Sequence, residues 1–357
     1  MIYAVHLLND FSGSPKVLSQ LVRGWAKAGK EVTVVTSQAS SGFLSDLHGC
    51  FYLYHNYIFV SNKWLRLILL FWNQMRLCII LYRKLQKDDI VYINTVLPFG
   101  AAIAGKCKGV RVISHIHETS IKPALLKKFL FGVVAKTASQ TVYVSRYLAD
   151  NEGVGNSRYI LYNALPDGFG PQKKQNMEKL YRSNVLMICS LKGYKGIHEF
   201  LKLAAKNPKY NFRLVVNANE SEISNYFVNE KVTSNVEIYP VQNDVKPFYE
   251  WSDVVLNLSR PDGWVETFGL TVIEAMAFGR PVIVPPVGGI AELVTDGING
   301  FKADSRNINH ISSLLRKILD DEAMYNTMSQ SASELVKNYD EASFIRESIQ
   351  LLEMTTE

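Results

Sequence analysis

The stretch that decides the fold covers residues 264–289 and reads WVETFGLTVIEAMAFGRPVIVPPVGG. It holds two carboxylates, Glu266 and Glu274, eight residues apart in an otherwise apolar, glycine-punctuated run. The preceding DVVLNLS is predicted to be a strand, LTVIEAMAF a helix that ends at a Gly-Arg-Pro sequence, and PVIVPP the next strand. This order of strand, loop, helix and strand is typical of a parallel α/β sheet.

The start of the predicted helix suits a phosphate group. The first turn of a helix presents unpaired backbone N–H groups and a partial positive charge, and Gly269 allows a ligand to approach the backbone closely. With a diphosphate seated there, Glu266 in the loop and Glu274 on the helix can accept hydrogen bonds from hydroxyls on either side, each contributing about 1.5–3 kcal/mol. A ligand with hydroxyls at both ends of a diphosphate is a nucleotide sugar. The backbone of four residues would form the phosphate seat: Thr267, Phe268, Gly269 and Leu270.

A second interpretation of the same stretch needs no ligand. Thr271 and Glu274 match the Ser/Thr-x-x-Asp/Glu pattern of a capping box, in which the glutamate bonds the start of its own helix. Glu266 would then be a solvated loop residue. Both interpretations stay open from the sequence of the stretch alone.

The rest of the chain predicts two α/β domains in tandem. Residues 1–165 alternate β-branched and aromatic runs with helical stretches, and the same alternation restarts over residues 185–340. Between them, residues 166–184 carry Pro, Gly and charge without an apolar period, which predicts a linker. Open parallel sheets bind ligands beyond the carboxyl ends of their strands, so we expect a ligand cleft between the domains.

Composition excludes several classes of protein. A chain of 357 residues with 47% apolar and 20% charged residues is typical of a globular protein of two domains. Its four cysteines lack CxxC pairing, so neither a disulfide framework nor a zinc site is expected and a reducing cytoplasm fits best. The N-terminal MIYAVHLL is typical of a strand rather than a signal peptide. Because Asp88 and Asp89 precede a strand instead of ending one, we expect no essential metal, and we expect no cofactor.

The net charge of +6 divides unevenly along the chain. Residues 1–165 carry 19 Lys and Arg against 8 Asp and Glu, a net +11, and the remainder carries 20 against 25, a net −5. This asymmetry suggests different partners for the two halves, although ordinary surface charge for solubility is the alternative.

Two basic, apolar segments of the first half are candidates for contact with an anionic membrane. Residues 63–87 and 121–138 combine large apolar side chains with Lys and Arg at helical spacing. The first segment also contains Arg66, Asn73, Gln74 and Arg76, which make it a poor transmembrane span, and we expect it simply to cover the sheet. For the second segment we favour membrane contact.

Two further segments of the first half place polar groups at strand ends. In NDFSGS, Gly13 lies where the first strand turns into the first helix, so its backbone can face a diphosphate, although a simple turn is the alternative. The segment lacks GxGxxG spacing, which disfavours NAD. In RVISHIHETS, alternation places His115 and His117 on the same face near the carboxyl end of a strand. A purely structural histidine is the alternative interpretation of each.

Residues 266–301, ETFGLTVIEAMAFGRPVIVPPVGGIAELVTDGINGF, resemble the signature of the family-four retaining glycosyltransferases. That signature is a Glu, seven residues and a second Glu, followed by a Gly-Pro-Val-like strand and a Gly-Gly-x-x-Glu segment. The resemblance extends over nearly the whole chain, through FSGSPKVLSQLVRGWAKAGKEVTVVTS, SHIHE, the predicted strand pair YVSRYLAD and ILYNAL, CSLKGYKGIHEFLKLA and the terminal helix SFIRESIQLLE. It implies the GT-B fold: two facing Rossmann-like domains with parallel sheets, the terminal helix of residues 341–357 packing back onto the first.

The resemblance also implies roles for single residues. Glu266 would contact hydroxyls of the transferred sugar, and Glu274 would hold the ribose hydroxyls beside the phosphate seat. Lys195 would neutralise the departing diphosphate, because the charge of the leaving group grows in the transition state. His117 would line the reaction centre and position donor or acceptor, with action as a base as a further hypothesis.

One position departs from the family pattern. The family usually carries an arginine five residues before the lysine, and Ser190 stands there in CSLKGYKG. Lys192 could supply the missing charge, although Lys and Arg are not equivalent at phosphate sites. Selection of the nucleobase is expected from the loop YPVQNDVKP through the backbone near Tyr239 and Val241.

The expected activity is transfer of a sugar from a nucleotide diphosphate sugar to an acceptor hydroxyl with retention of configuration. A glycan or lipid-linked acceptor is expected in the first domain, within assembly of a bacterial capsule, lipopolysaccharide or exopolysaccharide. The protein would be cytoplasmic, at the inner face of the membrane if the basic segments bind lipid, with no nucleic-acid partner. The alternative is a GT-B protein that binds a nucleotide sugar without transfer, or an epimerase of the same fold.

Overall fold

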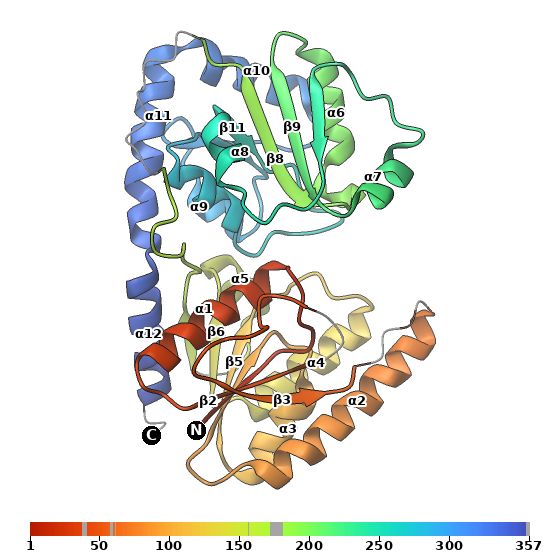
Figure 1. The fold of residues 1–357 in the computed structure, drawn as a ribbon, viewed down its shortest axis with the longest axis vertical. Coiled ribbons are helices and arrows are strands. Elements are labelled where there is room, and N and C mark those ends of the chain that lie inside the picture. Colours follow the sequence, from red (N-terminus) through yellow and green to blue (C-terminus); the bar gives the residue numbers. More distant parts are fainter. Residues whose placement is uncertain (38–40, 58–59, 61, 156, 172–180, 355–357) are drawn as a thin grey trace. The chain divides into compact units, whose positions relative to one another are not determined.

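The computed structural model describes residues 1–37, 41–57, 60, 62–155, 157–171 and 181–354. The chain divides into two compact units, each built on its own sheet (Figure 1). The first unit comprises Met1–Ala164 and Glu341–Glu357, and the second comprises Leu165–Asp340. Both sheets are parallel, which confirms the predicted α/β fold of two Rossmann-like domains.

The first unit contains a seven-stranded sheet in the order β3-β2-β1-β4-β5-β6-β7, paired in parallel throughout. Its strands are β1 (Ile2–Val5), β2 (Val32–Ser37), β3 (Phe51–His55), β4 (Ile90–Asn94), β5 (Arg111–Ile116), β6 (Gln140–Tyr143) and β7 (Arg158–Ile160). The innermost strands are apolar runs buried on both faces, as expected for a parallel sheet covered by helices.

Helices cover both faces of this first sheet because right-handed crossovers place successive helices on the side set by the direction of travel. The helices are α1 (Gly13–Lys27), α2 (Lys63–Lys84), α3 (Phe99–Lys108), α4 (Ala124–Thr137), α5 (Arg146–Glu152) and α12 (Glu341–Glu353). Helix α2 packs on α3 and α3 on α4, whereas α12 packs on α1 (Figure 1). Trp25 Nε1 donates to Ser348 Oγ at 2.9 Å, which ties the terminal helix into the first unit.

The second unit contains a six-stranded parallel sheet in the order β10-β9-β8-β11-β12-β13. Its strands are β8 (Asn184–Ser190), β9 (Asn211–Asn217), β10 (Val236–Tyr239), β11 (Val254–Leu256), β12 (Val282–Val284) and β13 (Gly300–Lys302). Its helices are α6 (Ile197–Lys206), α7 (Glu220–Phe227), α8 (Lys246–Trp251), α9 (Leu270–Ala277), α10 (Ile308–Asp320) and α11 (Glu322–Leu335), with short 3₁₀ helices η1 (Gly193–Lys195), η2 (Gly289–Leu293) and η3 (Val336–Tyr339).

The segment YVSRYLAD differs from the prediction of a strand pair. Strand β6 ends at Tyr143, and helix α5 begins at Arg146. The reason is Ser145, whose extended backbone and side chain cap the helix: its Oγ accepts the Leu148 N–H at 3.2 Å. The second strand of the pair, β7, lies slightly before the predicted ILYNAL.

The predicted linker lies partly outside the described residues, which omit 172–180. Its flanks pack within the second unit. The Phe169 ring lies 5.8 Å from that of Phe278, and the Ser183 N–H donates to Asp253 Oδ2 at 2.9 Å. The second unit therefore begins at Leu165, well before the strand that was expected to open it.

Candidate functional site

The strand order of the second sheet sets the place of its candidate site. Strands β8 and β11 are neighbours, but β8 is followed in the chain by β9 on one side and β11 by β12 on the other. At such a switch point the two connections leave in opposite directions and open a crevice at the carboxyl ends of the strands. Lys195 lies in the connection after β8, and Glu266 lies in the connection after β11.

These two predicted residues meet in an ion pair. Lys195 Nζ lies 2.6 Å from Glu266 Oε1, and both side chains are mostly buried, at 15% and 16% exposed. Ser259 Oγ donates to the same oxygen at 2.6 Å, and Asn257 Nδ2 lies 3.5 Å from it. Burial acts to raise the pKa of Glu266, but the Lys195 charge and these hydrogen bonds together lower it below its usual value. The interpretation of Glu266 as a solvated loop charge is therefore wrong.

Two aromatic rings lie beside the ion pair. Tyr194 and Trp264 stack with ring centroids 5.8 Å apart and an interplanar angle of 19°. Lys195 Nζ lies 5.2 Å from the Trp264 ring centroid, within reach of a cation–π interaction. The Arg260 N–H donates to the Tyr194 carbonyl at 2.8 Å and so fastens the two connections to each other.

Helix α9 begins as the sequence predicts, but without the capping box. Its N-cap is Gly269 at φ 124°, with no side-chain cap, and a Cβ there would lie 2.7 Å from Ile290 Cγ1. Thr267, Gly269 and Leu270 are partly exposed, while Phe268 is buried. The first N–H groups of a helix have no partner inside it, so this helix start is available to an anion. The capping-box interpretation of Glu274 is wrong because the helix starts too early for that residue to reach its N-cap.

Glu274 instead faces the interior of the second unit. Its side chain is only 4% exposed, and Glu274 Oε2 accepts the Tyr249 hydroxyl at 2.7 Å. Burial, and then the charge of Glu274, raise the pKa of Tyr249 well above its usual value, so the phenol stays a donor. Sequence reasoning missed Tyr249, because KPFYEWS showed only an amphipathic helix and gave no sign of its partner 25 residues later.

The other residues predicted to bind the donor lie at or just after the carboxyl ends of β8 and β10 in the same sheet. Tyr239 donates its hydroxyl to Glu237 Oε2 at 2.6 Å. The Val241 N–H donates to the Ala218 carbonyl at 3.0 Å, so only the carbonyl of Val241 could read a nucleobase edge. Ser190 is the last residue of β8, and Lys192 is exposed. Lys192 precedes Lys195 by three residues in the chain. Of these two lysines, Lys195 is the one whose side chain reaches Glu266 in the described part of the chain.

The first sheet has a corresponding switch point between β1 and β4. Asn94, at the end of β4, donates through Nδ2 to the Ser14 carbonyl at 3.0 Å, and His6 Nδ1 lies 3.0 Å from the same Nδ2 and 3.1 Å from the Asn94 carbonyl oxygen. It thus joins the end of β1 to the start of α1, where Gly13 is the first helical residue. Burial lowers the pKa of His6 to about 4, so this histidine is neutral at neutral pH.

The two predicted histidines of the first unit lie together. The rings of His115 and His117 are 4.2 Å apart, and the Tyr92 hydroxyl lies 2.8 Å from His115 Nδ1. Burial lowers the pKa of His115 to about 3; burial and then the neighbouring His115 and His6 lower that of His117 well below its usual value. Both imidazoles are therefore neutral at neutral pH.

Glu118 is a candidate that sequence reasoning missed. Its Oε2 accepts the N–H of Val96 at 3.3 Å and of His117 at 3.2 Å, so it links the connections after β4 and β5. Burial raises its pKa to about 7, against the hydrogen bonds that favour the charged form. The signal was present in SHIHE, where this acid follows the predicted histidine directly.

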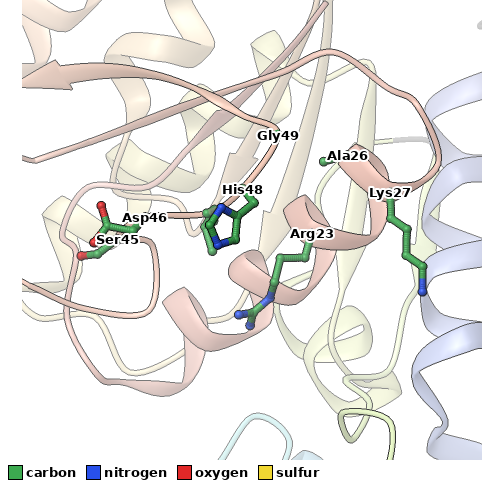
Figure 2. Close-up of a pocket in the computed structure, with 8 residues that line it drawn as sticks. Arg23, Ala26, Lys27, Ser45, Asp46, His48 and Gly49 are labelled. Carbon is green, nitrogen blue, oxygen red and sulfur yellow. The ribbon is translucent and has the colours of Figure 1, made fainter.

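Metal-binding clusters and cavities are two further places where a site could lie. Within the described ranges, no group of three or more His, Cys, Asp or Glu could hold a metal ion. An open depression of about 550 Å³ lies between α1 and the segment that precedes β3. Figure 2 shows the side chains that line it. It is lined by Arg23, Ala26, Lys27, Ser45, Asp46, Leu47, His48 and Gly49. None of these is a predicted site residue.

Two parallel Rossmann-like units of this kind define the GT-B class of glycosyltransferase fold. The chain is similar to HepE of Anabaena, solved in complex with UDP and glucose, with a TM-score of 0.81 over 99% of each chain at 18% identity. The model of Glycosyltransferase Family 4 matches residues 11–151, and that of Glycosyl transferases group 1 matches residues 171–335. The two matches together cover most of both units and, with the fold, support a family-four-like glycosyltransferase of the GT-B class.

Curated relatives agree with this family. An uncharacterised glycosyltransferase of Methanocaldococcus jannaschii is 24% identical over 265 residues, which are 70% of this chain and 71% of the relative. The N,N'-diacetylbacillosaminyl-diphospho-undecaprenol alpha-1,3-N-acetylgalactosaminyltransferase of Campylobacter jejuni is 27% identical over 172 residues, 47% of this chain and 43% of that protein.

Proposed function

We propose that this glycosyltransferase moves a sugar from a nucleotide diphosphate sugar to an acceptor hydroxyl with retention at the anomeric carbon. The observation that carries the proposal is the ion pair of Lys195 and Glu266 at the switch point of the second sheet. Lys195 would supply a cation for the diphosphate, and Glu266 would supply a carboxylate for hydroxyls of the sugar. Lys195 follows β8 and Glu266 follows β11, the two neighbouring strands at the switch point.

Binding of the donor would separate Lys195 from Glu266. Lys195 would turn from Glu266 Oε1 to the diphosphate, and Glu266 would accept hydroxyls of the sugar in its place. Ser259 and Asn257 already donate toward Glu266, so they would hold the carboxylate while the lysine moves. The start of α9 would bind the phosphates through backbone N–H groups.

The proposed chemistry follows a front-face route. The bond from the anomeric carbon to the diphosphate oxygen breaks, an oxocarbenium-like centre develops, and the acceptor hydroxyl attacks from the same face. The acceptor proton passes to the departing phosphate. Lys195 and the backbone amides of α9 would carry most of the catalysis by stabilising the leaving group's charge. This route needs no nucleophile from the protein.

We also propose that Lys195 meets the charge of the leaving group without an essential metal ion. Transfer should then persist in excess chelator, and loss that is restored by a divalent cation would overturn this part. In the first unit, His117 would position donor or acceptor as a neutral imidazole, and the backbone at Gly13 would face the diphosphate.

For the acceptor, we propose a glycan or lipid-linked glycan in the assembly of a bacterial cell-surface polysaccharide. Support comes from the Campylobacter jejuni relative, whose name gives a diphospho-undecaprenol-linked acceptor. The net +11 of residues 1–165 would favour an anionic, lipid-bound substrate at the cytoplasmic face of the membrane. Ordinary surface charge remains the alternative source of this asymmetry.

Two measurements test the proposal in sequence. In a thermal-shift panel of UDP-, GDP- and dTDP-sugars, one class of donor should raise the melting temperature of the protein, because a ligand that binds the folded state stabilises it. With that donor, free nucleotide should appear only when a lipid-linked glycan extract is added. Binding without acceptor-dependent release would favour the binding protein or epimerase, an alternative that the serine at position 190 supports.

A further inference from the structure

Helix α2 carries a continuous apolar stripe on the side that faces away from the sheet. Eight large apolar side chains on it are exposed, three or four residues apart along one face. They are Trp64 (79% exposed), Leu65 (47%), Ile68 (66%), Phe71 (40%), Trp72 (53%), Met75 (47%), Ile79 (46%) and Tyr82 (47%). We call these eight residues the α2 stripe. Single exposed apolar residues are ordinary, but a contiguous row of this length marks an interaction surface.

The opposite side of α2 is fixed in the core of the first unit. Leu77 and Leu81 are fully buried in a cluster with residues of β1, β2 and β4. Gln74 Oε1 accepts the Gly100 N–H at 2.9 Å, and a Cβ on Gly100 would lie 2.1 Å from the Gln74 carbonyl oxygen. The helix is therefore apolar on two sides, one covering the sheet and the other without cover among the described residues.

The charge around the stripe has one sign. Residues 62–87 contain no Asp or Glu, and α4 contains none either. The basic residues of α2 whose side chains the structure describes are Arg66, Arg76, Arg83 and Lys84. Lys108 of α3 lies 4.8 Å from the Tyr82 ring centroid and adds a cation at that end of the stripe.

The stripe continues onto α4. The Phe71 ring lies 5.3 Å from that of Phe129, which is 39% exposed, and Leu125 is 79% exposed. Lys128, also exposed, lies between those two α4 residues in the chain. An apolar surface with two tryptophans and a tyrosine, on two helices whose own charged residues are all basic, is complementary to the headgroup region of an anionic bilayer.

We propose that α2 lies in the plane of an anionic bilayer surface, with its stripe in the boundary between headgroups and acyl chains and with Leu125 and Phe129 beside it. The sequence expectation was that this helix only covers the sheet and that residues 121–138 contact the membrane. The structure assigns the larger exposed apolar surface to α2, which covers the sheet with its other side.

Over Trp64–Lys84, α2 is also long and apolar enough to cross a membrane, by length and composition alone, and 28% of its 18-residue apolar stretch is buried in the fold. Spanning would carry Asn73 and Gln74, which are 2% and 1% exposed, out of the core and into hydrocarbon. Such transfer would break the hydrogen bond from the Gly100 N–H to Gln74 Oε1 and the packing of α2 against the sheet. The in-plane arrangement keeps the core intact, and we therefore favour it over a span.

Membrane binding by α2 would bring the enzyme to the lipid-linked acceptor proposed above, and only this purpose rests on the proposed function. Binding to lipid needs neither donor nor acceptor. Vesicle binding and donor binding can therefore fail independently of each other.

The experiment is vesicle flotation of the full chain with phosphatidylcholine alone and with added phosphatidylglycerol. The test variant combines Ile68→Ser, Trp72→Ser and Ile79→Ser. A matched control combines Tyr181→Ser, Val228→Ser and Ile298→Ser, which remove exposed apolar side chains from the second unit. The donor-induced rise in melting temperature, measured for each variant, shows that the fold and the donor site survive.

We expect the wild type and the control to float with the anionic vesicles, and the stripe variant to bind at least about tenfold more weakly, given the free energy of burying apolar groups in the interface. Alkaline carbonate should release the protein. Three outcomes would overturn the inference: no flotation of the wild type with either vesicle, flotation of the stripe variant equal to that of the wild type, or a wild-type dimer in solution that the stripe variant abolishes. Retention through carbonate would contradict the in-plane mode.

Discussion

Lys195 and Glu266 illustrate how one residue pair can hold a site ready before its ligand arrives. The lysine charge keeps a mostly buried carboxylate ionised, and the carboxylate keeps the lysine at the switch point. Lys195→Ala should lower kcat by about 10²–10³-fold, because the departing diphosphate loses its cation in a site with little water. Lys192→Ala is the matched control, since Lys192 is exposed. Full turnover in Lys195→Ala with loss in Lys192→Ala would transfer the role to Lys192.

Tyr249 gives a second prediction at the scale of a single residue. Tyr249→Phe removes the donor to the buried carboxylate of Glu274 and should lower the free energy of unfolding by about 1–3 kcal/mol. Tyr239→Phe, which removes a partly exposed hydroxyl bonded to Glu237, should cost less than about 0.5 kcal/mol. Urea denaturation of both variants gives the comparison. Equal costs would mean that the Tyr249–Glu274 bond does not support α9.

At the scale of elements, the start of α6 approaches the end of β11 so closely that only glycine fits at position 196. Gly196 has φ +82°, and a Cβ there would lie 2.1 Å from the Leu258 carbonyl oxygen. Gly29, with φ +77° and open space around it, isolates the cost of the backbone conformation. Gly29→Ala should cost about 1–2 kcal/mol, and Gly196→Ala distinctly more, with weaker donor binding because Lys195 is displaced. Similar losses in urea denaturation would show that the clash relaxes without consequence.

Sequence patterns predicted most of these elements because buried parallel strands and amphipathic helices differ in period and composition. The patterns did not separate the two sides of α2, since apolar residues cover both, and the period alone cannot say which side meets the sheet. The capping box failed for a related reason: the pattern fits any Thr-x-x-Glu, whereas the observed start of α9 is set by Gly269 and its contact with Ile290.

At the scale of the whole molecule, buried ionisable groups of the first unit should make stability depend on pH. The pKa values of His6 and His115 fall from 6.5 to about 4 and about 3, so the folded state binds fewer protons than the unfolded state and stability is lost as the pH falls below 6.5. The pKa of Glu118 rises from 4.5 to about 7, so its contribution is lost as the pH rises through that window.

Glu118→Gln isolates the second effect, since the amide oxygen can still accept the two N–H groups while the group no longer titrates. Between pH 4.5 and 6.5, the buried histidines His6, His115 and His117, whose pKa values are all lowered, outweigh the single carboxyl of Glu118. Each group changes the stability by up to about 1.4 kcal/mol per pH unit. The variant should therefore lose stability with acid more steeply than the wild type, by thermal unfolding across that range. A stability difference between variant and wild type that does not change with pH would contradict the account of Glu118.

The sequence indicated the candidate site better than its surroundings. Lys195, Glu266 and Glu274 carry a recognisable spacing, so the order of residues along the chain is enough to name them. Tyr249 and Glu118 escape that approach, because Tyr249 matters through a partner on another helix and Glu118 through two strand connections that only the folded sheet brings together.

The central claim is that Glu266 holds the sugar while transfer takes place, and acceptor-dependent release of free nucleotide tests it most directly. With the donor found in the thermal-shift panel, adding a lipid-linked glycan extract should raise release by the wild type. Glu266→Gln should lower that rate by about 10²–10³-fold, with an unchanged far-ultraviolet circular dichroism spectrum. Release by the folded variant at a rate close to that of the wild type would contradict the account.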